Sequence, residues 1–145
     1  MHVVDANVVL SALRSRNGAS HIILREMLVG TVPFAVSPAV ALEYEAVLKR
    51  PGILGDRAWI TRDEIDVILD AILKQATLVS PWFRFRPFLL DPGDDLHVEC
   101  ALAASAATIV TSDRHFNAPE VGAFGMSVVK AGEFLADLRR RRQPT

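Results

Sequence analysis

Short valine-rich runs alternate with longer amphipathic segments along the chain, and this alternation limits the fold more than any other feature. Each run suits one short strand, and each longer segment has apolar residues three and four apart, as on one helix face. The predicted strands are residues 2–4, 33–37, 77–80, 108–113 and 126–130, and the predicted helices are 6–15, 19–30, 38–50, 62–76, 95–107 and 131–142. This alternation predicts an α/β domain with a mainly parallel central sheet of about four to five strands.

Local signals mark several helix ends. Ser37 followed by Pro38 is a cap-then-proline start, and Thr61 with Glu64 three residues later is a capping-box pattern. Gly30 ends the second predicted helix. We expect residues 81–95 to be mostly loop.

Length and composition favour one globular domain over residues 1–145. The chain has 145 residues, of which 50% are hydrophobic and 23% charged. A net charge of −1 means that any binding to nucleic acid depends on local basic patches rather than on bulk charge. The single cysteine, Cys100, excludes an internal disulfide and a cysteine-cluster metal site, and its alanine-rich surroundings favour a small core residue.

The amino-terminal segment lacks the cationic start of a signal peptide, and Asp5 and Asn7 interrupt its apolar run. No apolar stretch reaches the roughly 20 residues that a membrane span needs. We therefore expect a cytoplasmic protein without a membrane partner.

Carboxylates recur where a parallel sheet would bring them together. Asp5 and Asp113 each follow a predicted strand, Asp94 and Asp95 lie at the start of a helix, and Glu43 lies in the helix after the second strand. Ligand sites of such sheets lie beyond the carboxyl ends of the strands. We therefore expect these side chains to converge at one edge.

Each carboxylate also has a structural interpretation. Asp5 or the Asp94–Asp95 pair can cap a helix, Asp113 can close a turn, and Glu43 can be a solvated helix residue. Taken together these interpretations are weaker, because several carboxylates at one edge repel one another unless a cation lies between them. Oxygen ligands without cysteine favour a hard cation, Mg²⁺ or Mn²⁺.

Four acidic segments follow one another along the chain: "VVDANVVLSAL", "SPAVALEYEAVLKRP", "DPGDDLHVECALAA" and "IVTSDRHF". In this order and spacing they resemble the acidic blocks of PIN domains, whose first strand ends in D-x-N. The resemblance runs almost end to end, and it is strongest to the toxins of toxin–antitoxin systems related to VapC-type ribonucleases. It implies a three-layer α/β/α domain.

The resemblance also implies roles for single residues. The catalytic acids would be Asp5, Glu43, Asp94 and Asp113, and the metal ligands would be Asp5, Asp94 and Asp113, with Asp95 as the alternative to Asp94. Asn7 would support the site by hydrogen bonding, and Ser112 would orient Asp113 or a phosphate.

The implied activity is Mg²⁺- or Mn²⁺-dependent cleavage of RNA. A divalent cation mediates between an anionic phosphodiester and an acidic cluster, and it activates water for attack. The sequence does not distinguish one ion from two. Contact with RNA is expected from Arg84 and Arg86 within "WFRFRPF", whose alternation also suits a half-buried strand, and from Arg114 and His115 beside Asp113.

The carboxyl-terminal run Arg139–Arg142 suits a solvated helix end that complements the helix dipole, with contact to RNA or to an acidic partner segment as the alternative. A cognate antitoxin and a homodimer are the partners implied by the resemblance. Two other functions compete with the nuclease: a PIN-like RNA- or protein-binding module, and a phosphatase of the haloacid-dehalogenase type. The phosphatase is disfavoured because its D-x-D pattern is Asp5-Ala6-Asn7 here.

Overall fold

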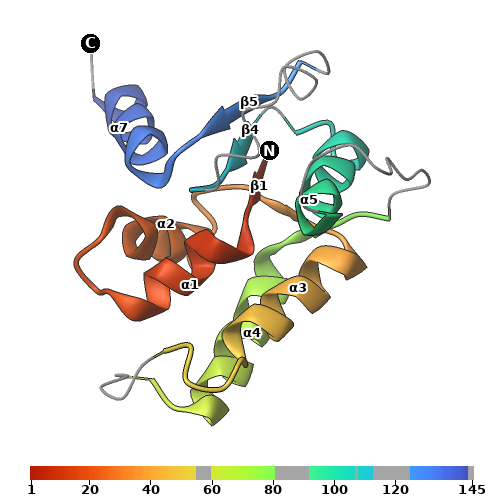
Figure 1. The fold of residues 1–145 in the computed structure, drawn as a ribbon. Coiled ribbons are helices and arrows are strands. Elements are labelled where there is room, and N and C mark those ends of the chain that lie inside the picture. Colours follow the sequence, from red (N-terminus) through yellow and green to blue (C-terminus); the bar gives the residue numbers. More distant parts are fainter. Residues whose placement is uncertain (55–59, 81–91, 107, 113–124, 144–145) are drawn as a thin grey trace.

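The computed structural model describes residues 1–54, 60–80, 92–106, 108–112 and 125–143, with side chains between 92 and 106 described from residue 96 onward (Figure 1). The strands are β1 (His2–Val4), β2 (Ala35–Val36), β3 (Thr77–Leu78), β4 (Thr108–Val110) and β5 (Ser127–Val129). The helices are α1 (Ala6–Arg14), α2 (Ala19–Leu28), α3 (Pro38–Leu48), α4 (Arg62–Gln75), α5 (Pro92–Ala103) and α7 (Ala131–Arg142).

All strand pairs within the described residues are parallel, which confirms the predicted α/β fold. One sheet has the order β1-β4-β5, with Val4 opposite Val110 and Val110 opposite Val129. A second sheet pairs β2 with β3, and a single parallel bridge from His2 to Phe34 connects it to β1. The strand β1 therefore lies between β4 and β2, in the middle of the arrangement.

The predicted helix ends are confirmed where the sequence carries an explicit signal. The Ser37 hydroxyl accepts a hydrogen bond of 3.1 Å from the Val40 N–H and caps α3. Thr61 and Glu64 form both halves of a capping box at α4. Gly30 follows the end of α2 with a φ of +86°, a conformation that glycine adopts without a steric cost.

Three predicted boundaries near the acidic segments are wrong. Helix α5 begins at Pro92 rather than at residue 95, so the last residues of the predicted loop are helical. Proline suits the first helical turn because its missing N–H has no partner there in any case. The helix ends at Ala103, and Ser105 beyond it has a φ of +52°. Strand β4 ends at Val110 rather than at residue 113.

The core lies around the strands and is built from the apolar faces that the periodicity predicts. Val3, Val4, Ile109 and Val110 are fully buried in adjacent strands. Helix α4 contributes Ile65, Leu69 and Ile72 to this core, and all three are buried within the chain itself. Burial of this kind is the main favourable contribution to folding.

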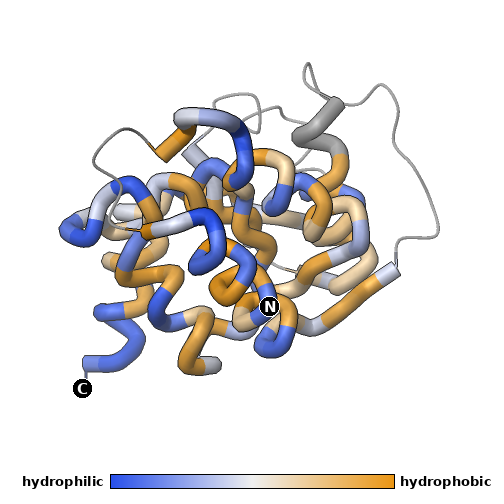
Figure 2. The backbone as a smooth tube through the Cα atoms, turned by 90° about the horizontal axis from the view of Figure 1, so that it is seen from below, coloured by the Kyte–Doolittle hydropathy of each residue, from blue (hydrophilic) through white to orange (hydrophobic). Residues whose placement is uncertain are grey.

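Helices cover both sides of the β1–β4–β5 sheet. Helix α5 contacts β1, β2 and β4, and it also packs against α3. Figure 1 shows α2 and α7 on the other side of the strands, where α2 contacts α1, α4 and α7. The last turns of α7, near the carboxyl terminus, are strongly hydrophilic (Figure 2). Within the described ranges, no helix combines the length and apolar character that crossing a membrane requires.

Candidate active site

Asp5 lies at the junction of β1 and α1, where the strand leaves the sheet. Its N–H donates a hydrogen bond of 2.8 Å to the carbonyl of Val110 in β4, which fixes the backbone at the carboxyl end of both strands. Its side chain caps α1 by accepting a bond of 3.4 Å from the Asn7 N–H. Although charged, Asp5 is only 5% exposed. A buried carboxylate needs polar neighbours, and the surrounding elements supply them.

Thr111 provides the shortest of these contacts. Its hydroxyl donates a hydrogen bond of 2.6 Å to Oδ2 of Asp5, and both side chains are buried. Thr111 directly follows β4, and its N–H donates to the carbonyl of Val129 in β5 at 3.0 Å. The hydroxyl is therefore held by the sheet itself, and a hydrogen bond to an ionised acceptor is stronger than one between neutral groups.

His97 approaches the other carboxylate oxygen. Its Nε2 lies 3.5 Å from Oδ1 of Asp5, and the residue is 1% exposed. His97 comes from α5, the helix whose first turn contains Asp94 and Asp95. This close approach brings a buried side chain of α5 to the end of β1.

Tyr44 joins α3 to the same point of the sheet. Its hydroxyl donates a hydrogen bond to the carbonyl of Val4, the residue before Asp5. The side chain is buried, and burial, with Cys100 and Asp5 nearby, raises the pKa of the phenol well above its usual value. Glu43 is the residue that precedes Tyr44 on α3, and it is half-buried.

Asp5 is thus the meeting point of the elements that carry the other predicted acids. Tyr44 stands beside Glu43, His97 stands three residues after Asp94, and Thr111 stands two residues before Asp113. Each of these buried side chains contacts Asp5 or the residue before it. The end of β1, helix α3, helix α5 and the end of β4 are therefore held together around one carboxylate.

Asn7 and Ser112 form a second link across the same edge. The Ser112 N–H donates to Oδ1 of Asn7 at 3.5 Å, which connects the first turn of α1 to the chain just after β4. Ser112 itself is exposed. The hydroxyl that contacts Asp5 belongs to Thr111, and the role predicted for Ser112, toward Asp113 or a phosphate, stays a prediction.

The other predicted site residues are described in part or not at all. For Asp94 and Asp95 the structure describes only the backbone, in the first turn of α5. Asp113, Arg84, Arg86, Arg114 and His115 lie outside the described residues. Among the side chains that are described, no three histidine, cysteine or acidic groups are gathered closely enough to hold a metal ion.

Sequence reasoning missed Thr111, His97 and Tyr44 as site residues. Thr111 was hidden because the adjacent Ser112 carries the same functional group. His97 lacks the spacing of a metal ligand. The sequence signal that could have indicated it is weak: a histidine between the apolar residues Leu96 and Val98, shortly after the paired acids Asp94 and Asp95. Tyr44 is the only tyrosine of the chain and stands between Glu43 and Glu45.

Cys100 is buried in the core behind this site, as the sequence predicts. Burial raises the pKa of its thiol to about 11, while a hydrogen bond with Ser37 opposes part of that increase. A thiol with this pKa stays protonated near neutral pH and is a poor nucleophile.

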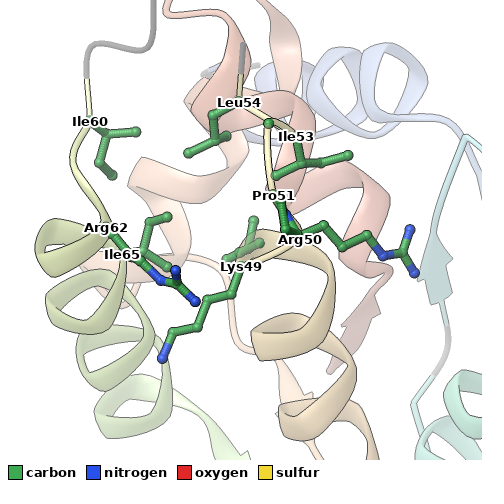
Figure 3. Close-up of a pocket in the computed structure, with 10 residues that line it drawn as sticks. Lys49, Arg50, Pro51, Ile53, Leu54, Ile60, Arg62 and Ile65 are labelled. Carbon is green, nitrogen blue, oxygen red and sulfur yellow. The ribbon is translucent and has the colours of Figure 1, made fainter. Parts of the chain in front are cut away.

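The cavity of Figure 3 lies elsewhere, between the end of α3 and the start of α4. It combines an apolar lining that includes Ile53, Ile60 and Ile65 with the basic residues Lys49, Arg50 and Arg62. It is separate from the candidate active site, because its lining includes no residue of the Asp5 cluster, by which we mean Asp5, Tyr44, His97 and Thr111.

The arginine run of α7 is at the opposite edge of the sheet from Asp5. Arg141 lines a small cavity with His2, Thr108 and Ser127, the first residues of β1, β4 and β5. Arg140 pairs with Asp137, and Arg142 pairs with Glu26 at 3.1 Å. These contacts favour the solvated helix end over a direct role near Asp5.

Comparison with known proteins gives one family. The family model described as PIN domain matches residues 2–115, which include β1 to β4 and every element around Asp5. No curated protein matches the chain. PIN domains are generally nucleases that use divalent metal ions. The geometry around Asp5 and the match over most of the chain lead to one conclusion: this protein belongs to the PIN domain family.

Proposed function

We propose that this PIN domain is a metal-dependent endoribonuclease, the toxin of a toxin–antitoxin pair, that hydrolyses RNA phosphodiester bonds. The observation that carries the proposal is the set of contacts to Asp5. Buried groups from the elements that bear the other predicted acids contact this carboxylate or its strand. A carboxylate held so rigidly at the end of a central strand suits a ligand for a cation.

The chemistry of the described residues fits a hard divalent ion. Each carboxylate oxygen has two acceptor positions, so the bonds from Thr111 and Asn7 leave Asp5 able to coordinate a cation. Glu43 adds a second carboxylate from α3, next to Tyr44. Asp113 and an acid of α5 would complete the oxygen ligands that Mg²⁺ or Mn²⁺ prefers. When bound, the ion supplies Lewis-acid activation of water and neutralises charge on the phosphate.

The protein's own groups orient and hold this ligand. The Thr111 hydroxyl and the Asn7 N–H fix the two Asp5 oxygens, and the Asp5 N–H anchors the backbone to β4. The link from Ser112 to Asn7 holds the chain that leads into Asp113. Pre-organisation of this kind holds the carboxylate ligands in position, despite their mutual repulsion, before the cation binds.

Helical spacing favours Asp94 over Asp95 as the ligand from α5. Position 94 precedes His97, Val98 and Ala101 by three, four and seven residues, the spacing of one helix face. Those three residues are buried. Val98 and Glu99, three and four residues after position 95, are buried as well, so the preference rests on His97, which contacts Asp5. Position 95 is turned by about 100° from position 94.

The proposed substrate is single-stranded RNA, bound by Arg84, Arg86, Arg114 and His115 around the acidic edge. Rings and guanidinium groups of the segment "WFRFRPF" suit stacking on unpaired bases. A homodimer and a cognate antitoxin remain the proposed partners, in a cytoplasmic setting.

The decisive experiment compares wild type with Asp5→Asn, Glu43→Gln and Glu45→Gln on a mixed RNA pool. We expect Mg²⁺- or Mn²⁺-dependent cleavage by wild type and by Glu45→Gln, and a loss of about a hundredfold or more in the other two variants. Glu45 lies on the same helix as Glu43 and serves as the matched control. Calorimetric titration with Mn²⁺ measures the site without relying on the RNA target.

Cleavage of RNA by Asp5→Asn in the presence of chelator would disprove the proposal. Hydrolysis of a small phosphate monoester without any RNA cleavage would instead favour the phosphatase. Mn²⁺ binding that Asp5→Asn leaves unchanged would place the metal elsewhere.

A further inference from the structure

A largely apolar groove runs between α3 and α4. Its volume is about 380 Å³, twice that of the cavity in Figure 3, at about 190 Å³. The apolar lining comes from both helices: Pro38, Ala41, Leu42, Leu69, Ile72 and Leu73. Side chains of the Asp5 cluster, apart from Tyr44, do not line it.

Two leucines of this groove face solvent. Leu42 is 68% exposed and Leu73 is 37% exposed, whereas Leu69 and Ile72, which also line the groove, are buried. Burying the apolar surface of these leucines is favourable, by a free energy of roughly 25 cal/mol for each Å² removed from water. A partner that places apolar side chains in the groove would cover both residues.

The charges of the groove are all of one sign. Its charged lining residues are Glu45, Asp66 and Asp70. Asp66 pairs with Lys49 at 2.6 Å, while no ion pair involves Asp70 within the part of the chain that the structure describes. Lys49 offsets part of this charge, and the remaining acidic excess of the rim comes from Glu45 and Asp70. The cavity in Figure 3 has instead the basic residues Lys49, Arg50 and Arg62. Complementary charge is what steers a partner and selects its sequence.

We propose that this groove binds an amphipathic helical segment of another protein, with apolar residues on one face and lysine or arginine beside them. The apolar face would cover Leu42 and Leu73, and the basic residues would meet Glu45 and Asp70. This is the helix-in-groove mode of recognition. The proposal does not depend on the nuclease, because no step of it involves the Asp5 carboxylate.

A second copy of the chain fits this groove less well. Two grooves placed face to face would bring the acidic rims together, and like charges in contact are unfavourable. The basic helix α7 has the required charge, but its residues Phe134 and Leu135 are buried against its own chain. It therefore has no matching apolar face to place over Leu42.

The test uses a synthetic peptide of about four helical turns, with leucine at one-face spacing and lysine at the other positions. Its fluorescent form is titrated with the full chain, and anisotropy measures binding. A peptide with glutamate in place of lysine and a scrambled peptide are the comparison probes. Leu42→Ser and Asp70→Lys alter the groove. Val67→Ser is the matched control, since Val67 is 67% exposed on α4 and does not line the groove.

We expect saturable binding of the lysine peptide that Leu42→Ser and Asp70→Lys each weaken by about tenfold or more, and that Val67→Ser leaves unchanged. The proposal would be overturned if the glutamate or scrambled peptide bound as tightly as the lysine peptide, or if the lysine peptide showed no saturable binding. It would also be overturned if Val67→Ser weakened binding as much as the two groove variants do. A wild-type dimer in light scattering that Leu42→Ser converts to a monomer would show that a second copy occupies the groove instead. The variants alter exposed positions, and circular dichroism verifies that they fold.

Discussion

The hydroxyl of Thr111 donates a hydrogen bond of 2.6 Å to Oδ2 of Asp5, across two adjacent parallel strands. The two residues are separated by most of the chain, yet both directly follow the last paired residues of their strands, Val4 and Val110. Parallel pairing in this register is what brings them together. The contact therefore depends on the register of the sheet and belongs to the candidate active site, so a substitution that removes it probes both.

Replacing Thr111 with valine removes this hydroxyl and keeps the shape of the side chain. We expect Thr111→Val to lower the free energy of unfolding by roughly 1.5–3 kcal/mol, because it removes a buried hydrogen bond to a charged acceptor. Thr111→Ser should recover most of the loss. Urea denaturation measures the effect, and Thr108→Val, at the start of the same strand, is the control. A loss no greater than that of the control would show that the contact contributes nothing.

Much of the fold follows from local sequence. The helices that begin at Pro38 and Arg62 start where the proline and capping-box signals predict, and the last helix begins at Ala131, as predicted. The start of α5 was missed because the glycine and paired aspartates after Pro92 suit a loop as well as a first helical turn. Thr111, His97 and Tyr44 were missed because their roles arise from contacts between distant segments, and no local pattern encodes these contacts.

The single tyrosine of the chain offers a spectroscopic measure of the same region. Burial raises the pKa of Tyr44 well above its usual value, and the phenol donates to the Val4 carbonyl. We therefore expect no phenolate absorbance as the pH rises through the usual range of tyrosine, until the protein unfolds in alkali. The absorbance change should coincide with the loss of helical circular dichroism. Phenolate formed while the helices persist would contradict the buried hydrogen bond.

The choice between Asp94 and Asp95 is open to direct measurement. If position 94 shares the helix face of His97 and Val98, Asp94→Asn should weaken Mn²⁺ binding by about tenfold or more, and Asp95→Asn should change it far less. Calorimetric titration with Mn²⁺ gives both affinities, and each variant is the control for the other. The reverse order would assign Asp95 as the ligand, and equal small effects would exclude α5 from the metal site.

His2 makes stability depend on pH at the opposite edge of the sheet. Burial, followed by the nearby amino terminus and Arg141, lowers the pKa of the ring from 6.5 to about 4, and the ring meets Phe134 edge-on with a centroid distance of 4.8 Å. The unfolded chain therefore binds a proton more readily than the folded one, so the contribution to stability is complete above pH 6.5 and is lost as the pH falls toward 4. Because the ring is only half-buried, we expect a loss of about 1 kcal/mol. His2→Phe keeps the ring contact and cannot titrate, so its free energy of unfolding should fall less steeply over this range. Identical slopes for wild type and variant would show that His2 does not contribute.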